Sequence, residues 1–422
     1  MAALPPRPIT DRLAELRGPV PPRHHDARTI AALTGNPGCS RRAVLDAAGV
    51  DKRTLAERIG FGARFGQSPF AISRGNAFEK LVKADGGATL LRLLREGVGL
   101  AVGESGHGWV DLGEGEREER YRNTRELVAA AARDPEGQAA LADHPLLTLD
   151  VGGRTAYVEP DLVAFRVRGG GGVDNGSVDN GSTDNGSTDN GSAGTWRWHL
   201  AEIKSFAMID GRADPMKVAE AATQAAVYVL AFQRLLADLG LPTDSVATQV
   251  VLICPKDFTN TPVAALVDVR RQLAAVRRQL DRLPRIGELL DTLDAGVSFD
   301  LSKDADGEPA QDVAQLGKAI ATIEARYAPD CVSRCDMAFY CRDEARTAGS
   351  TDVLGRSVRD ALGGIGSVHE ALMLSEADAG AFGDDAYEDA DLAEASRLLR
   401  TARRARRDAL REAQERAQES AA

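Results

Sequence analysis

Two short stretches decide the fold that this sequence predicts: Tyr157-Val-Glu-Pro-Asp161-Leu and Glu202-Ile-Lys204. Asp161 follows one apolar run, and Glu202 and Lys204 lie at the end of the next one. Residues two apart on an extended strand point to the same face of a sheet, so we expect Glu202 and Lys204 to share a face. Carboxylate oxygens are the ligands that hard divalent cations prefer. The two runs therefore predict a cation site at Asp161 and Glu202, with Lys204 beside it.

A third stretch, Gln224-Ala-Ala-Val-Tyr228, lies in an apolar segment from Pro215 to Leu236 that predicts a helix. Gln224 and Tyr228 are four residues apart, so both side chains lie on one face of that helix. An amide and a phenol at this spacing can act together on a neighbouring group. The alternative is that both residues are ordinary helix contacts.

The ordered combination of Glu159-Pro-Asp161, Glu202-Ile-Lys204 and Gln224-x-x-x-Tyr228 resembles the PD-(D/E)XK nuclease superfamily, in its RecB-like branch. The resemblance implies an α/β fold with a restriction-endonuclease-like core, in which helices flank a mixed central sheet, and with helical N- and C-terminal extensions. It implies Mg²⁺ or Mn²⁺ held by Asp161, Glu202 and the backbone carbonyl of Ile203. Lys204 is expected to orient or deprotonate the attacking water or to stabilise the phosphorus centre. Gln224 and Tyr228 are expected to position the DNA strand or the catalytic pair.

The segment Ser73-Arg-Gly-Asn-Ala-Phe-Glu-Lys-Leu-Val82 predicts a helix, with Phe78, Leu81 and Val82 toward a core. Within the resemblance this is the first motif helix, where relatives commonly carry a histidine four positions after the glycine. Here Gly75 is followed at that spacing by Glu79. A glutamate also ligates divalent cations, so Glu79 is expected as a further metal ligand. The alternative for Glu79 is an exposed helix charge.

The chain has five cysteines, and four of them form a pattern. Cys39 stands far upstream, whereas Cys331, Cys335 and Cys341 follow the expected nuclease core as C-x3-C-x5-C. One distant cysteine before the core and three after it resemble the iron–sulfur nucleases, including the AddB nuclease domain and the CRISPR-associated adaptation exonucleases. The resemblance implies a 4Fe–4S cluster on these four thiolates. Zinc is the alternative occupant, although zinc sites more often pair cysteines as C-x2-C.

The fifth cysteine, Cys254, ends the apolar run Thr248-Gln-Val-Val-Leu-Ile-Cys254, and we expect it to be a buried core thiol. The cysteine usage suits a reducing compartment. No apolar stretch reaches membrane-spanning length, and the segment before Cys39 lacks the apolar region of an export signal. We therefore expect a cytoplasmic protein without a membrane partner. The net charge of -11 excludes a generally basic surface for nucleic acid, but a local basic groove stays compatible with it.

Composition divides the chain into segments. Residues 1–27 are proline-rich and are expected to be a disordered arm. Residues 28–346 are expected to be the nuclease domain, closed by the cysteine cluster. Within it, residues 169–194 repeat Asp-Asn-Gly-Ser and predict a low-complexity loop insert. Residues 347–422 are expected to be a helical C-terminal extension with an arginine-rich last helix.

Apolar patterns within the domain predict individual elements. Residues 86–145 are expected to be mostly helical, and residues 266–293 are expected to be a long helix that breaks at Pro284. The Gly152-Gly153 pair between two alternating runs predicts a hairpin of residues 147–151 and 155–158.

The expected function is that of a metal-dependent deoxyribonuclease. The resemblance favours an exonuclease in DNA repair, recombination or phage defence, acting on single-stranded DNA or on DNA with single-stranded ends. The alternative is a catalytically silent iron–sulfur DNA-binding or scaffold subunit of a helicase or defence complex, although the intact Asp161, Glu202 and Lys204 weigh against it. An RNA-directed nuclease also fits the residues. The sequence has no G-x-x-x-x-G-K-[ST], so ATP-driven unwinding requires a separate helicase subunit.

Overall fold

The computed structural model describes residues 8–62, 69–100, 102, 108–133, 141–152, 154–168, 196–281, 286–294, 296–376 and 390–421. The predicted low-complexity insert at 169–194 lies outside the described residues. The chain divides into two compact units, which are described separately. We call Arg23–Thr34 with Arg64–Glu288 the sheet unit, and Met1–Pro22 with Gly35–Ala63 and Leu289–Ala422 the cysteine unit.

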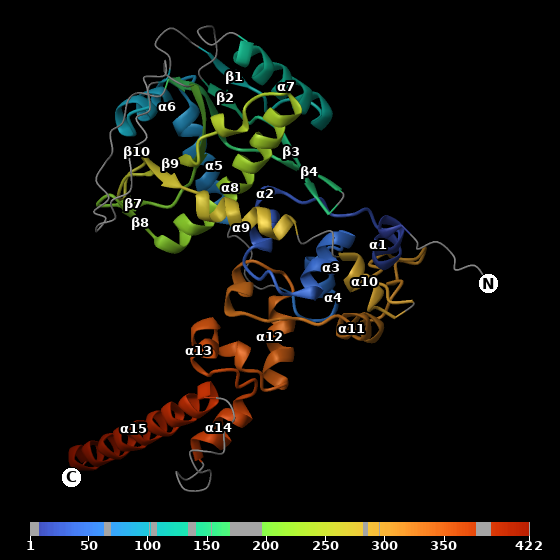
Figure 1. Cartoon of the computed structure of the whole chain (residues 1–422), viewed down its shortest axis with the longest axis vertical. Coiled ribbons are helices and arrows are strands. Elements are labelled where there is room, and N and C mark those ends of the chain that lie inside the picture. Colours follow the sequence, from blue (N-terminus) through green and yellow to red (C-terminus); the bar gives the residue numbers. More distant parts are fainter. Residues whose placement is uncertain are drawn as a thin grey trace. The chain divides into compact units, whose positions relative to one another are not determined.

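A six-stranded sheet with the order β1-β2-β5-β6-β9-β10 forms the centre of the sheet unit (Figure 1). The β1–β2 and β6–β9 pairs are parallel, and the other neighbouring pairs are antiparallel. This arrangement confirms the mixed central sheet that the sequence predicts. The strands are β1 (Trp109–Asp111), β2 (Leu141–Asp143), β5 (Leu162–Arg168), β6 (Trp196–Ile203), β9 (Gln249–Pro255) and β10 (Pro262–Asp268).

Helices cover both faces of this sheet, so the fold is the predicted α/β type. One face packs on α2 (Ala27–Leu33), α7 (Arg117–Arg133), α8 (Pro215–Asp238) and α9 (Arg270–Leu280). The other face packs on α5 (Pro69–Lys83), α6 (Ala88–Arg92) and the π-helical turn η1 (Leu93–Gly97). In β6, Leu200 packs on the α8 side while Ala201 and Ile203 pack on the α5 side, because side chains alternate along a strand.

The hairpin of β3 (Leu147–Val151) and β4 (Arg154–Val158) is confirmed as an antiparallel pair. Gly152 has a φ of 64° at its turn, a conformation that glycine adopts without strain. The hairpin is a separate two-stranded sheet that packs against α8 and the core on that side. The strand β4 ends at Val158, so the hairpin delivers Glu159 and Asp161 to the start of β5.

Two predicted helical segments are wrong in part. The segment 86–145 contains β1 and β2, and the segment 266–293 begins within β10 before α9 and α10 (Ile286–Asp291). Strands of three residues carry no measurable periodicity, and they form here because neighbouring strands supply their hydrogen bonds. The predicted helix at residues 73–82 is confirmed within α5, where Phe78 and Val82 are buried, but Leu81 is exposed.

The cysteine unit is mainly helical, and it joins segments from both ends of the chain. The predicted disordered arm at 1–27 instead contains α1 (Ile9–Arg17), whose Leu13 and Leu16 are buried and whose Leu16 carbonyl accepts from the Phe299 amide at 2.6 Å. The remaining helices are α3 (Ser40–Ala48), α4 (Lys52–Arg58), α11 (Val313–Ala321), η4 (Pro329–Ser333), α12 (Ala338–Thr347), η5 (Thr351–Leu354), α13 (Arg356–Ala361), α14 (Val368–Glu376) and α15 (Ala390–Ala421). This unit spans the boundary that the sequence predicts at residue 346.

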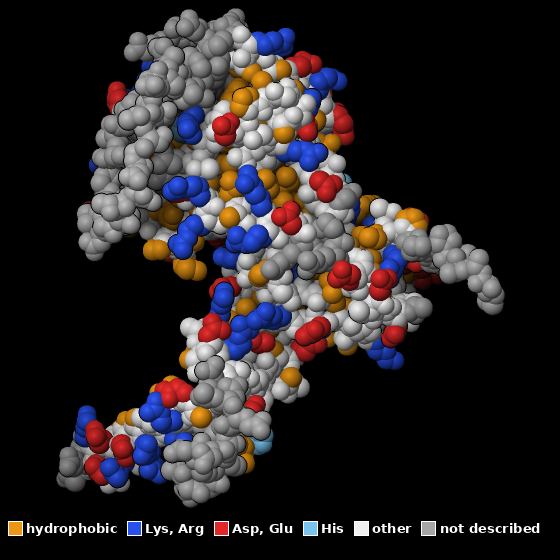
Figure 2. All heavy atoms as spheres, in the orientation of Figure 1, with side chains coloured by type: hydrophobic (Ala, Val, Ile, Leu, Met, Phe, Trp, Pro, Cys, Tyr) orange, Lys and Arg blue, Asp and Glu red, His pale blue; other side chains and the backbone are white. Residues whose placement is uncertain are grey.

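The last helix, α15, packs on α14 near its start through Leu392, Ala395 and Leu399. Basic and acidic side chains are interspersed along its length (Figure 2), and its residues from 401 to 416 are exposed. Such mixed charge is typical of a solvated helix. No helix among the described residues is both long and apolar enough to span a membrane.

Candidate active site

Strand pairing brings the two predicted carboxylates together. Leu162 of β5 pairs with Ala201 of β6, so Asp161 lies beside the end of β6. The Ile203 amide donates to Asp161 Oδ2 at 2.7 Å, which holds the Asp161 carboxylate at this edge. Glu202 is 1% exposed and, by alternation, faces α8 like Leu200.

Glu202 and Lys204 form an ion pair, as their shared strand face predicts. Lys204 Nζ lies 2.5 Å from Glu202 Oε2, while Glu202 Oε1 is buried with no hydrogen-bond partner among the described residues. Burial raises the pKa of Glu202 to about 8, and the charge of Asp161 adds to this effect while Lys204 opposes it. Burial also raises the pKa of Asp161. Burial lowers the pKa of Lys204, but the charges of Glu202 and Asp161 outweigh burial and raise this pKa above its ordinary range.

The helix α8 adds the two other predicted residues. Asp214 caps its start by accepting from the amides of Met216 and Lys217. Gln224 Nε2 donates to the Tyr228 hydroxyl at 2.8 Å, as the spacing of four predicts. Tyr228 is buried, and burial followed by the charges of Glu202 and Asp161 raises the pKa of its phenol well above the ordinary value. Tyr228 is therefore coupled electrostatically to both carboxylates, and its hydrogen bond with Gln224 links Gln224 to the same group.

Glu79 approaches the same group from α5. Its charge contributes to the pKa shifts of Asp161, Glu202 and Lys204, so the four side chains form one electrostatic cluster. Glu79 Oε1 lies 2.5 Å from Lys83 Nζ and 3.3 Å from His144 Nε2. Glu79 thus has partners within the site, whereas the alternative from the sequence was an exposed helix charge. We call Glu79, Asp161, Glu202 and Lys204 the carboxylate cluster.

A polar network next to this cluster was not predicted from the sequence. Lys83 Nζ lies 2.6 Å from Asp143 Oδ1 and 3.0 Å from His144 Nε2, and His144 Nδ1 lies 2.9 Å from Glu159 Oε1. Arg120 also binds Glu159 Oε1, at 2.9 Å. His144 has a φ of 50°, a left-handed conformation that non-glycine residues rarely adopt and that is often found at functional sites.

The protonation of this network follows from its contacts. The hydrogen bond to Glu159 raises the pKa of His144, against the effect of burial. Burial raises the pKa of Glu159, but its hydrogen bonds to His144 and Arg120 outweigh this and lower it. The two shifts act in the same sense, because each favours the charged form of its own group. The only sequence signal for this network was Glu159 in the Glu-Pro-Asp stretch, because the position of His144 depends on the three-residue strand β2.

Replacing Lys83 with methionine is expected to lower the free energy of unfolding by about 3–5 kcal/mol. The Lys83 ammonium compensates Asp143, whose side chain is only 6% exposed and whose pKa burial raises. Without it, the buried Asp143 keeps only the more distant His144 Nε2, at 3.8 Å, as a neighbouring cation among the described residues. Urea denaturation measures the change, and Lys80→Met on the exposed face of α5 is the matched control. Equal unfolding free energies for the two variants would contradict the compensation by Lys83.

The four patterned cysteines belong to the same unit. Cys39 precedes α3, Cys331 lies in η4, Cys335 follows η4 and Cys341 lies in α12. Burial raises the pKa of Cys341 to about 12; Arg41 opposes this effect, and the charges of Cys39 and Cys335 add to it. Cys254 is fully buried among Ala221 and Leu252 in the other unit, which confirms the predicted core thiol.

Two hydrogen-bond donors reach the sulfur atoms. Asn36 Nδ2 donates to Cys331 Sγ and Arg41 NH1 donates to Cys341 Sγ, both at 3.3 Å. Arg41 also binds Glu344 through both guanidinium nitrogens at 2.7 and 2.9 Å, which ties α3 to α12. Donors of this kind commonly surround thiolates that bind a metal or cluster.

The donor chemistry of both groups fits the expected occupants: soft sulfur atoms for an iron–sulfur cluster or zinc, and carboxylate oxygens for Mg²⁺ or Mn²⁺. Within the ranges that the structure describes, however, no three His, Cys, Asp or Glu side chains stand in an arrangement that could hold a metal ion. A metal ion or cluster at either group would therefore require some movement of the side chains.

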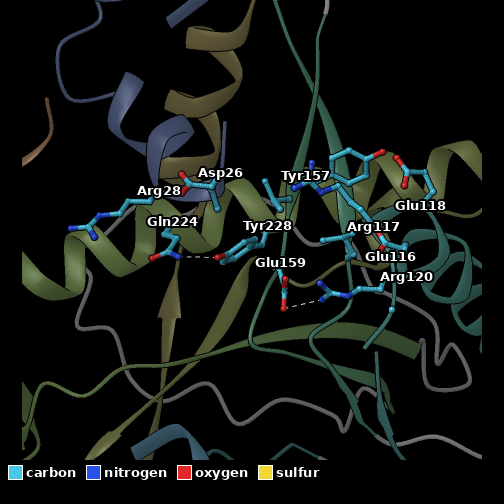
Figure 3. A pocket seen from close by; sticks show the side chains of 14 residues that line it. Asp26, Arg28, Glu116, Arg117, Glu118, Arg120, Tyr157, Glu159, Gln224 and Tyr228 are labelled. Carbon is cyan, nitrogen blue, oxygen red and sulfur yellow. Dashed lines mark hydrogen bonds and ion pairs between the residues drawn. The ribbon is translucent and has the colours of Figure 1, made fainter. Parts of the chain in front are cut away.

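A pocket of about 640 Å³ opens in the sheet unit (Figure 3). It is lined by residues of α2, α7, β4 and α8, including Glu159, Gln224 and Tyr228. The pocket thus includes three residues of the predicted motifs, while Asp161, Glu202 and Lys204 do not line it.

No protein-family model and no curated protein matches this chain. Among solved structures, the crystal structure of a Eubacterium rectale protein described as a presumed exonuclease is similar with a TM-score of 0.27 and 14% identity. The match covers 64% of this chain and 82% of the other. At these values the likeness carries no argument, so the fold rests on the observed sheet and the function on the site.

Proposed function

We propose that this chain is a metal-dependent deoxyribonuclease that hydrolyses phosphodiester bonds. The observation that carries the proposal is Glu202, a buried carboxylate with one oxygen paired to Lys204 and the other unpartnered among the described residues. An unsatisfied buried carboxylate is costly unless it is neutralised or coordinates a cation. Asp161 and Glu79 add two further carboxylates around it, which favours a divalent cation in this cluster.

In this proposal Asp161, Glu202 and Glu79 hold Mg²⁺ or Mn²⁺, with the Ile203 carbonyl as a further ligand. A bound divalent cation would neutralise negative charge on a phosphate. The PD-(D/E)XK superfamily, in its RecB-like branch, is the class whose motifs match these residues.

The residues of the chain have separate roles in this proposal. Lys204 stabilises the charge that develops on the scissile phosphate, and its raised pKa favours this electrostatic role over proton abstraction. Tyr228 also keeps its proton and can donate a hydrogen bond to a phosphate oxygen, while Gln224 orients its hydroxyl. The Ile203 amide keeps Asp161 in place at the edge of the sheet.

The cysteine unit is proposed to hold a 4Fe–4S cluster on Cys39, Cys331, Cys335 and Cys341, with zinc as the alternative occupant. Two observations support this assignment. The four cysteines supply soft sulfur ligands from distant parts of the chain, and Asn36 and Arg41 donate hydrogen bonds to two of the sulfur atoms. A cluster there would link the segment that contains Cys39 to the segment after residue 289, and so would stabilise a unit assembled from separate parts of the chain.

The test is cleavage of labelled linear and circular DNA, single-stranded and double-stranded, with Mg²⁺ or Mn²⁺ and anaerobically purified protein. Metal-dependent cutting by the wild type that Lys204→Ala slows by about 10²–10³-fold supports the nuclease. Cutting that requires a free end identifies an exonuclease, and labelled RNA in parallel tests the RNA-directed alternative. No cutting by a protein that retains its cluster would refute the nuclease and favour a DNA-binding or scaffold subunit.

Cation binding is expected to weaken as the pH falls below about 8, because Glu202 must lose its proton to act as a ligand. The apparent dissociation constant of Mn²⁺ should rise about tenfold per pH unit if one proton is displaced. Without metal, the stability of the fold depends on pH in the opposite sense. Folding raises the pKa of Glu202, so its protonated carboxyl contributes to the free energy of unfolding at low pH, and this contribution is lost as the pH rises toward about 8.

Calorimetric titration of Mn²⁺ between about pH 6 and pH 8 measures this dependence. Glu202→Gln should bind more weakly and lose most of the pH dependence. Glu126→Gln, on the exposed face of α7, is the matched control and should behave as the wild type. A wild-type affinity that is constant over this range would contradict a proton-coupled ligand at Glu202.

A further inference from the structure

The pocket of the sheet unit borders the carboxylate cluster at two points. Tyr228 lines the pocket, and the charges of Glu202 and Asp161 act on its phenol. Glu159 lines it as well, and contacts His144, which in turn lies 3.3 Å from Glu79. Contacts through Glu159 and His144 thus connect the lining of the pocket to Glu79 of the carboxylate cluster.

The pocket offers planar surfaces that suit a nucleobase. Tyr157 of β4 is half-buried, and the guanidinium of Arg117 lies over its ring at 5.1 Å from the centroid (Figure 3). Tyrosine rings and guanidinium planes are the side-chain surfaces on which unpaired bases stack. Gln224 Nε2 donates to Tyr228, which leaves the amide oxygen of Gln224 as an acceptor for a base amine.

The charge of the lining favours a base over a phosphate. Arg120 is already bound to Glu159 Oε1 at 2.9 Å, the Leu112 carbonyl at 2.8 Å and the His144 carbonyl at 3.1 Å. Four carboxylates and three arginines line the pocket: Asp26, Glu116, Glu118 and Glu159, with Arg28, Arg117 and Arg120. Carboxylates repel a phosphate, but they accept hydrogen bonds from the amino and imino groups of bases.

A cavity of about 640 Å³ lies within the range of small-ligand sites. We propose that this pocket is a subsite for the base of an unpaired nucleotide next to the scissile phosphate, with Tyr157 and Arg117 as its stacking surface. The inference rests on the proposed nuclease function and adds a physical basis for a preference for single strands. In a duplex, each base is stacked and its pairing edge is occupied, so it cannot enter the pocket.

The experiment measures binding of a fluorescently labelled single-stranded oligodeoxynucleotide to the full chain by anisotropy, without added divalent cation. Tyr157→Ala is expected to weaken binding about tenfold, and Tyr157→Phe to retain the wild-type affinity. Arg117→Ala should also weaken binding, whereas Arg122→Ala, an exposed arginine of the same helix, should not. Affinity for a blunt duplex should change little in any variant.

An abasic nucleotide moved along the oligonucleotide provides a second, independent readout. At one position the abasic nucleotide should lower the affinity as much as Tyr157→Ala does. Combining the abasic nucleotide with Tyr157→Ala should then cause no further loss, because both changes remove the same contact. The subsite would be refuted if the affinity losses from the abasic nucleotide and from Tyr157→Ala add at every position. It would also be refuted if the wild type, Tyr157→Ala and Arg117→Ala bind the intact strand with equal affinity. Melting curves verify that each variant is folded.

The two proposals can fail separately. If the wild type cleaves DNA while Tyr157→Ala and Arg117→Ala bind single strands normally, the subsite is refuted and the nuclease stands. If single strands bind through Tyr157 but no metal allows cleavage, the nuclease is refuted and the base pocket stands.

Discussion

Replacing Lys204 with alanine is expected to lower the rate of DNA cleavage by about 10²–10³-fold. Lys204 is the cation paired with Glu202 at 2.5 Å, and its charge also acts on Asp161. A positioned charge of this kind stabilises the transition state more than the bound substrate, so the loss should appear in kcat with little change in KM. Single-turnover cleavage at saturating Mg²⁺ measures this effect directly.

The Lys204→Ala chain should remain folded. Removing one partner of a buried ion pair normally destabilises a protein, but the pKa of Glu202 is already about 8, so Glu202 can take up a proton near neutral pH. Lys217→Ala, an exposed lysine at the start of α8, is the control and should cleave at the wild-type rate. Wild-type cleavage by a folded Lys204→Ala protein would remove Lys204 from the mechanism.

Replacing Cys335 with serine is expected to abolish cluster binding and to destabilise the cysteine unit. Metal binding to structural sites is coupled to folding and contributes on the order of 10 kcal/mol in small zinc domains. Because a serine oxygen is a poor ligand for a soft metal, the variant should melt at the temperature of wild type from which the metal has been removed. Iron, sulfide and zinc analysis with thermal melting measures both effects and identifies the occupant.

Cys254→Ala is the matched control for the cysteine replacement. Cys254 is fully buried in β9 of the sheet unit, whereas the four patterned cysteines belong to the cysteine unit, so its loss should cost packing energy without changing the metal content. A Cys335→Ser protein with unchanged metal content would show that Cys335 is not a ligand. An absence of iron and zinc from anaerobically purified wild type would refute the occupied site altogether.

Much of the candidate site follows from local periodicity. The period of two on a strand correctly puts Lys204 beside Glu202, and the helical period correctly joins Gln224 to Tyr228 through a hydrogen bond. Glu79 was found from its position in a motif helix, and the structure brings it into the cluster. The first two relations depend on backbone geometry within one element, which a sequence pattern carries directly, whereas the expectation for Glu79 came from the family resemblance.

The second network could not be predicted in this way. Asp143 and His144 come from the end of β2, a strand of three residues that forms only because β1 and β5 pair with it. Lys83 and Arg120 come from helices on different faces of the sheet, and both appear in the sequence as ordinary charged positions. Their contacts depend on how the helices pack, which periodicity within each helix does not contain.

By itself, the sequence indicated the segments that carry Asp161, Glu202 and Lys204 and the chemical nature of the two candidate ligand sets, and its family resemblance implied the α/β class. Residue type and spacing were enough for the shared face of Glu202 and Lys204 and for the preferred kind of ligand, because they set side-chain direction within one strand and the chemistry of each donor. Only the tertiary structure decided that α1 and Cys39 share a unit with the last helices, that His144 meets Glu79, and that Glu159 and Tyr228 line one pocket. These features join residues distant in the chain, and their positions depend on how whole elements bury their apolar faces against each other.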